Sequence, residues 1–175
     1  ARSAAGSTHL QQRGIVMKML LVILIAMGFQ LTAGAQGRYQ VSSDGLEVVD
    51  SKTNLIWARC AVGMEYKNNR CTGSVVPLTH QLAVLRVAEI KAATGKPWRL
   101  PTAKELLSIA SLTLADVTAN TAAIDPKAFP DTPPSRFWSS TGAGPHYFLR
   151  VDFVDGTAGE STSSSPTAIR LVRDP

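Results

Sequence analysis

Few side chains in this sequence have the types and spacing that catalysis needs. Nucleophilic catalysis requires a serine or cysteine beside a base that a third group orients. Beyond residue 35 the only histidines are His80 and His146. The serines closest before His146 lie in the segment Trp138–Thr141, which lacks the G-x-S-x-G elbow of a serine hydrolase. We therefore do not expect an enzyme.

Metal and cofactor sites are also not indicated. Asp152 and Asp155 lie three residues apart at the end of a predicted strand. We interpret them as a solvent-facing residue and a turn former, because a metal site needs clustered ligands. Gly142–Gly144 lacks the third glycine and the strand-to-helix context of a nucleotide loop. The sequence predicts neither a metal nor a cofactor.

The two cysteines, Cys60 and Cys71, are expected to form a disulfide. Oxidising compartments favour this pairing, and a bridge would close a loop of ten intervening residues. Loop-closure entropy for this length suggests a stabilisation of about 3 kcal/mol. The alternative, a metal or redox pair, is weaker because the spacing is not C-x-x-C and His80 is the single histidine nearby.

Aromatic and basic side chains are the remaining candidates for ligand binding. Tyrosine rings can stack on sugars, and arginine can pair bidentately with sulfate or carboxylate. The alternative is that the basic residues are ordinary solvated charges. The tryptophans Trp57, Trp98 and Trp138 are expected in the core instead. The predicted ligand-binding residues are Tyr66, Lys67, Arg70, Arg136, His146 and Arg150.

The N-terminal residues indicate export. Met17 and Lys18 precede an apolar run, Met19–Phe29, and then the small residues Ala33-Gly34-Ala35. This order is typical of a signal peptide cleaved before Gln36, and the run is well short of the roughly 20 residues of a membrane span. We interpret residues 1–16 as upstream translation, 17–35 as signal peptide and 36–175 as one domain in the periplasm or cell exterior, with no membrane span.

The charge of residues 36–175 gives little support for nucleic-acid binding. The full chain carries a net charge of +5. Residues 1–35 contain three basic and no acidic residues, so the remaining 140 residues carry +2. Without a basic run or an RNA-binding motif, no nucleic-acid partner is expected.

The predicted elements follow an α+β order. The β-rich runs at residues 46–49 and 55–57 predict a hairpin. Residues 78–93 predict a helix that Gly95 and Pro97 end. Its apolar residues at helical spacing are Leu82, Leu85, Ala88 and Ala92, with Glu89 as the alternative to Ala88.

A second helix is predicted to begin near Ala103. Pro101 disfavours helical backbone at Leu100, Thr102 can cap the helix, and Glu105 can complete a capping box. Arg99 is expected to be partly buried and to pair with a carboxylate such as Glu105.

A long irregular loop and a set of antiparallel strands complete the chain. Ile124 and Phe129 are expected to pin the loop over residues 113–134. From Phe137 strands return, Asp155-Gly156 predicts a tight hairpin turn, and residues 167–173 predict a last strand. The strand residues Tyr147, Leu149, Val151 and Phe153 alternate so as to give one apolar face.

Five blocks in this order carry a family resemblance. They are D-x-x-T-x-L-x-W at residues 50–57, W-R-L-P-T-x-x-E-L at 98–106, W-S-S-T at 138–141, the hydrophobic strand ending in Asp155-Gly156, and the closing A-I-R-L-V-R at 168–173. Over residues 44–173 the sequence resembles the bacterial DUF1566 family, also called the Lcl C-terminal domain family. The resemblance implies a C-type-lectin-like fold, with small antiparallel sheets, paired terminal strands and two helices.

The resemblance does not bring every activity of similar folds with it. A calcium-dependent lectin site would be expected to show an E-P-N or Q-P-D loop and a W-N-D strand, and the sequence has neither. Sulfatase-activating oxidases share a similar core but depend on a reactive cysteine pair late in the chain, whereas no cysteine follows Cys71.

We therefore expect a secreted or periplasmic, non-enzymatic binding module that recognises an envelope or extracellular polysaccharide, as an adhesin does. Some members of the family resemble adhesion domains for anionic glycans, although the small net charge favours a polyanion only weakly and leaves neutral glycans open. The alternative is a protein-interaction or structural envelope domain. A groove formed by Arg70, Arg136 and Arg150 would favour binding of anionic glycans. An exposed apolar patch would favour a protein partner. A pocket that joins His146 to a carboxylate and a hydroxyl would favour catalysis.

Overall fold

The computed structural model describes residues 37–111 and 121–175. The interpretations of residues 1–16 and 17–35, and the part of the predicted loop at residues 112–120, lie outside the described residues. Among the described residues, no helix is both long and apolar enough to cross a membrane. The helices and strands are β1 (Tyr39–Val41), β2 (Glu47–Asp50), β3 (Leu55–Ala58), β4 (Met64–Lys67), β5 (Arg70–Gly73), α2 (His80–Thr94), α3 (Ala103–Ile109), β6 (Arg136–Gly144), β7 (Tyr147–Asp152), β8 (Thr157–Thr162) and β9 (Val172–Arg173).

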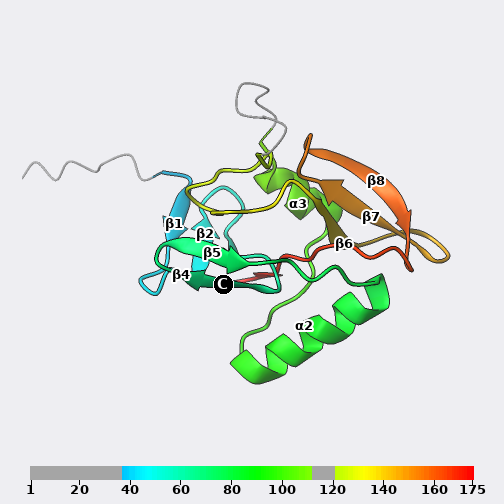
Figure 1. The fold of residues 1–175 in the computed structure, drawn as a ribbon, viewed down its shortest axis with the longest axis horizontal. Helices are drawn as coiled ribbons and strands as arrows, with labels where there is room; N and C mark the ends of the chain where they lie inside the picture. Colours follow the sequence, from blue (N-terminus) through cyan, green and yellow to red (C-terminus); the bar gives the residue numbers. More distant parts are fainter. Residues whose placement is uncertain (1–36, 112–120) are drawn as a thin grey trace, which may run out of the picture. The chain divides into compact units, whose positions relative to one another are not determined.

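Four strands form the first antiparallel sheet, in the order β1-β2-β3-β9 (Figure 1). The predicted hairpin is confirmed as β2–β3, in which Val48 pairs with Trp57 and both side chains are fully buried. Asn54 adopts the left-handed conformation, with φ of 57°, that the tight turn requires. The last strand is shorter than predicted, because Thr167 and Ala168 form isolated bridges to Leu78 and Phe137 instead.

A three-stranded antiparallel sheet, β6-β7-β8, forms the second layer, against which α3 packs (Figure 1). The prediction of one apolar face along β7 is wrong at its start. Tyr147 is 43% exposed, and only Val151 and Phe153 are fully buried, because the core covers that end of the strand alone. The turn is also wider than predicted, since four residues join β7 to β8 and only Gly156 has positive φ there.

Helix α2 confirms the predicted helix, with Thr79 as its N-cap and left-handed Gly95 as its C-cap. Its buried face differs from the predicted one. Ala83 and Val87 face the core, whereas Leu82 and Leu85 are 50% and 53% exposed. Ala83 belongs to a cluster that contains the Trp98 and Trp138 indoles, and a small side chain at this position lets the helix approach such bulky rings.

Helix α3 begins at Ala103, as the capping signal predicts. The Thr102 hydroxyl accepts from the Glu105 amide at 3.2 Å, and the Glu105 carboxylate accepts from the Thr102 amide at 2.7 Å, so both halves of the capping box are present. The predicted ion pair is confirmed, because Arg99 donates to both Glu105 carboxylate oxygens at 2.8 and 2.9 Å. One carboxylate therefore contacts both the helix start and Arg99, which forms an isolated bridge with Val172.

Replacing Thr102 with alanine should lower the free energy of unfolding by about 1 kcal/mol, because the Glu105 amide loses its acceptor. Urea denaturation followed by tryptophan fluorescence would measure this loss. Thr102→Ser keeps the hydroxyl and should stay close to the parent chain. An unchanged midpoint in the alanine variant would mean that Thr102 does not stabilise the helix as a cap.

Two hydrophobic clusters make up the core. One contains Trp57, Phe129, Phe137 and Phe153, and the other contains Trp98 and Trp138. All three tryptophans are buried, as predicted, and Ile124 and Phe129 pin the described part of the long loop. The sequence prediction missed Arg170, whose side chain is fully buried between the β3 end and Phe129.

Candidate functional site

The six predicted ligand-binding residues lie in three separate places. Tyr66, Lys67 and Arg70 lie on the β4–β5 hairpin, and His146 lies in the turn between β6 and β7. Arg136 and Arg150 lie on adjacent strands of the second sheet. The structure therefore does not gather the six residues into one site, although it keeps three together on the hairpin and two on the second sheet.

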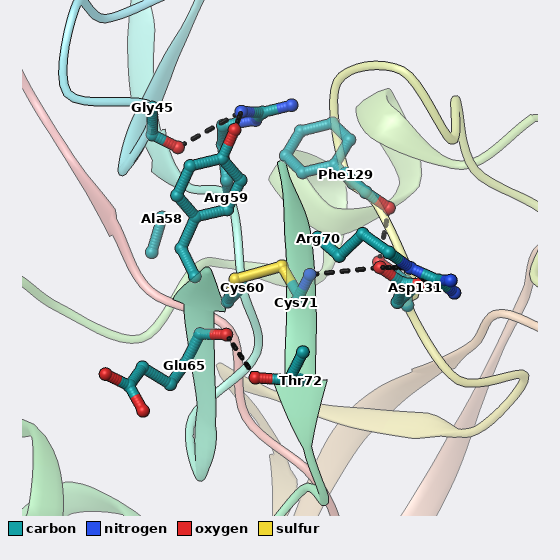
Figure 2. Close-up of a disulfide and its surroundings, with 12 residues drawn as sticks. Gly45, Ala58, Arg59, Cys60, Glu65, Arg70, Cys71, Thr72, Phe129 and Asp131 are labelled. Atoms are coloured by element: carbon teal, nitrogen blue, oxygen red, sulfur yellow. Dashed lines mark hydrogen bonds and ion pairs between the residues drawn. A yellow bond between two sulfur atoms is a disulfide. The ribbon is translucent and has the colours of Figure 1, made fainter. Parts of the chain in front are cut away.

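Two of the predicted side chains on the β4–β5 hairpin, Tyr66 and Arg70, make contacts within the protein, and Figure 2 shows Arg70 beside Asp131. The Tyr66 hydroxyl accepts from Arg59 Nη1 at 2.8 Å, and the Arg59 guanidinium lies 4.8 Å from the Tyr66 ring centroid. A ring that already stacks on a cation has one face less for a sugar. Arg70 pairs with Asp131, whose pKa is lowered by the hydrogen bond from Arg70.

The disulfide prediction is confirmed, since Cys60 and Cys71 are bonded with their Cα atoms 5.5 Å apart. The bond joins Cys60, in the segment after β3, to Cys71 in β5 of the hairpin (Figure 2). The Cys71 amide also donates to Asp131 at 3.0 Å. The hairpin is thus fastened on both sides by structural contacts.

Strand register places Arg136 and Arg150 on one face of the second sheet. Arg136 lies opposite Asp152, and Trp138 lies opposite Arg150, so the two arginines are diagonal neighbours at about 7 to 8 Å. On the other side of β7, Arg150 lies opposite Gly159, where an added Cβ would meet nothing within 4 Å. The flank of Arg150 towards β8 is therefore open.

The two guanidinium groups differ in how they are neutralised. Arg136 Nε donates to Asp152 Oδ2 at 2.9 Å. Arg150 makes no hydrogen bond or ion pair with any described residue, although its side chain is half-buried. Burial lowers the pKa of Arg150, and the positive charge of Arg136 lowers it further, while Asp152 acts in the opposite sense. Arg150 is thus a partly desolvated cation without a direct counter-ion.

Arg136 and Arg150 line a groove of about 310 Å³. With Asp152 on the same wall, two positive charges and one negative charge face the groove. Its other walls come from separate parts of the chain and are rich in proline: Pro77, Pro134, Ser135, Val154, Pro166, Thr167 and Ala168. We call this the Arg136–Arg150 groove. Arg70 does not line it, so the three-arginine groove considered from the sequence does not form.

The histidines do not join a hydroxyl nucleophile among the described residues. His146 is exposed and does not line the Arg136–Arg150 groove. His80 is buried, stacks on Phe148 at 3.4 Å between ring centroids and donates from Nε2 to the Ser139 carbonyl oxygen at 3.1 Å. The Ser139 hydroxyl donates instead to the Leu149 carbonyl. His80 is therefore a core residue that joins α2 to β6.

The burial of His80 predicts a loss of stability in mild acid. Burial lowers its pKa in the folded state below the ordinary value of about 6.5, which the unfolded chain retains. The unfolded state therefore binds the proton more readily, and the free energy of unfolding should fall as pH drops below about 6.5. Urea denaturation at pH 7.5, 6.5 and 5.5, about the range of histidine titration, measures this.

His80→Gln is the matched control for the pH experiment, because its amide can still donate to Ser139 but does not titrate. Its stability should change little across the same range. The carboxylates with lowered pKa values, such as Glu105, lose their contribution only at lower pH. An equal decline in both proteins would show that His80 is not its source.

Among residues 37–111 and 121–175, no group of three or more histidine, cysteine, aspartate or glutamate side chains is placed to hold a metal ion.

Comparison with known proteins gives one match. The model of the Lcl C-terminal domain matches residues 46–173, which is more than half of the chain. No curated protein and no solved structure matches the chain.

Proposed function

The chain belongs to the Lcl C-terminal domain family, and from this premise we propose that it is an exported, non-enzymatic binding module for an envelope or extracellular polysaccharide. The Arg136–Arg150 groove is its binding site. The Cys60–Cys71 disulfide supports export, because such bonds persist in oxidising compartments. A C-type-lectin-like fold is part of the proposal, and the presence of β1 and β9 in one sheet supports it. The expected pairing of the two terminal strands is wrong, because β9 pairs with β3 and lies at the opposite edge of that sheet from β1.

The half-buried side chain of Arg150, whose guanidinium has no hydrogen-bond or ion-pair partner among the described residues, is the observation that carries the proposal. Burying a cation without a partner is unfavourable, and a bound carboxylate or sulfate would supply the missing charge-assisted hydrogen bonds. Arg136 already has Asp152, so it is held in place beside Arg150. The pair would therefore bind one anionic group with little reorganisation.

The size and charge of the groove narrow the ligand. A volume of about 310 Å³ lies at the lower end of small-molecule sites, which span about 300 to 1,000 Å³. The groove therefore suits one substituted sugar ring. Its two arginines and one aspartate leave a single excess positive charge, which a carboxylate or sulfate ester would neutralise. Each bound unit would then contribute one anionic substituent.

Binding of the full chain to sulfated, carboxylated and neutral glycans at two salt concentrations tests this function. Anionic glycans should bind, more weakly at high salt. Arg150→Gln should reduce the affinity about tenfold or more, because hydrogen bonds to charged groups contribute about 1.5 to 3 kcal/mol. Lys104→Gln is the charge-matched control, since Lys104 is exposed on α3 and does not line the groove.

Absence of binding to any glycan, or equal loss in both variants, would contradict the proposal. The second candidate is then a protein-interaction or structural envelope domain. The exposed apolar residues Leu82 and Leu85 on α2 favour that role.

A further inference from the structure

The outer side of α2 is more apolar than a solvent-facing helix surface should be. Leu82 and Leu85, which are three residues apart and so share one side of the helix, are 50% and 53% exposed. A surface helix normally carries polar residues opposite its buried face, and a helix that is apolar all round is normally buried. The inner side of α2 is covered through Ala83 and Val87, whereas no described element covers its outer side (Figure 1).

The apolar surface extends beyond the helix. Leu82 and Leu85 line a groove of about 290 Å³ whose opposite wall includes Val62, Val76 and Leu78. Val76 is itself 48% exposed. Contiguous apolar surface of this kind, formed by three segments of the chain, is typical of protein–protein contacts. We call it the α2 face.

The charges on the α2 face decide which partner fits it. Arg86 and Glu89 line the same groove and form an ion pair of 2.9 Å, with both side chains more than half exposed. A twofold interface brings the same surface together twice, so it must complement itself. A surface with apolar residues, one cation and one anion meets this condition, because each cation can face the anion of the other copy.

We propose that the α2 face is the contact surface for a second copy of this chain, in a twofold symmetric dimer. In an antiparallel pair of α2 helices, the twofold axis would lie level with the midpoint between residues 87 and 88 along each helix. This register sets Arg86 of each copy opposite Glu89 of the other. The same register sets Leu82 opposite the exposed, small Ala93, which lets the two helices approach closely. The dimer does not depend on the proposed glycan function, since the two grooves share no lining residue.

Sedimentation velocity of the full chain tests the proposal at about 1 to 300 µM, the range in which micromolar association is visible. The sedimentation coefficient should rise with concentration to that of a dimer. Leu85→Glu should raise the dissociation constant about 30-fold or more, because it places a charge in the apolar contact of each copy. Leu107→Glu is the matched control, because Leu107 is an exposed leucine on α3 outside the α2 face and should leave dimerisation unchanged.

A mixing experiment separates contact between copies from the ion pair within one helix. R86E and E89R each break the Arg86–Glu89 pair and place like charges across the interface, so each should be monomeric alone. An equimolar mixture should associate with an affinity close to that of the parent chain, because one copy then offers two anions and the other two cations. The pair within each helix stays broken in the mixture, so recovery can come only from the interface. A parent chain that remains monomeric throughout, no effect of Leu85→Glu, or a mixture that does not associate would overturn the proposal.

Discussion

Replacing Arg170 with alanine should lower the free energy of unfolding by about 3 to 5 kcal/mol. The fully buried guanidinium donates to the carbonyl oxygens of Ala58 and Arg59 and to the Thr132 hydroxyl. Alanine would leave these acceptors without the donor and open a cavity. Because a domain of this size is stable by only about 5 to 15 kcal/mol, the loss should be evident in urea denaturation.

The surroundings of Arg170 explain why its effect should exceed that of any surface arginine. Its guanidinium lies 4.9 Å from the Phe129 ring centroid and 5.8 Å from that of Phe137. No carboxylate among the described residues pairs with it. Burial lowers the pKa of Arg170 to about 9, which still leaves the cation protonated at pH 7. Backbone carbonyls and aromatic faces therefore take the place of a counter-ion.

Two further variants separate the volume of Arg170 from its hydrogen bonds. Arg170→Met fills much of the space between the rings without a charge, so it should cost less than alanine. Arg170→Lys keeps a charge but lacks the planar fork that reaches all three acceptors, so it should not restore the parent stability. An alanine variant as stable as the parent chain would contradict the structural role of Arg170.

Elements with strong local signals were predicted well from the sequence. The capping box of α3 depends on Thr102 and Glu105, which are three residues apart, and it forms as expected. The β2–β3 hairpin likewise follows from two β-rich runs and a turn. Such features are decided by neighbouring residues, so a single sequence contains the information that they need.

The orientation of α2 could not be predicted in the same way. Its apolar residues occur on more than one side, so helical periodicity does not identify the buried face. The choice of Ala83 over Leu82 depends on the packing of Trp98 and Trp138. Those residues come from other parts of the chain, and their positions follow only from the tertiary fold.

The candidate site shows a similar division. Residue type alone nominates Arg136 and Arg150, but their proximity requires the register of β6 and β7. Arg70 was nominated for the same reason, yet Asp131, 61 residues later, pairs with it. Arg170 was overlooked because arginines are rarely buried, although it lies within the closing A-I-R-L-V-R block. The type of a residue is thus evident from the sequence, whereas its long-range partner depends on the tertiary fold.

Removing the disulfide by the double substitution Cys60→Ala and Cys71→Ala should lower the free energy of unfolding by about 3 kcal/mol. The two residues are 11 positions apart, and the estimate reflects the entropy that the open loop would regain in the unfolded chain. The contacts that join the hairpin to Asp131 in the long loop cannot replace the bond. They are the Arg70–Asp131 pair, which is largely exposed, and one hydrogen bond from the Cys71 amide. Exposed ion pairs contribute little to stability.

Reduction of the parent chain provides the matched control for the disulfide. Urea denaturation with and without a thiol reductant should show a lower midpoint for the reduced parent chain, close to that of the double variant. The double variant should not respond to the reductant, because it has no disulfide. Asp131→Asn, which removes the exposed charge but keeps an acceptor for the Cys71 amide, should have a much smaller effect than either. If Asp131→Asn destabilised the chain as much as loss of the disulfide does, the Arg70–Asp131 ion pair would be the main contact that holds the hairpin in place. Equal stability of the oxidised and reduced parent chains would show that the covalent bond adds nothing to the noncovalent contacts of β4 and β5.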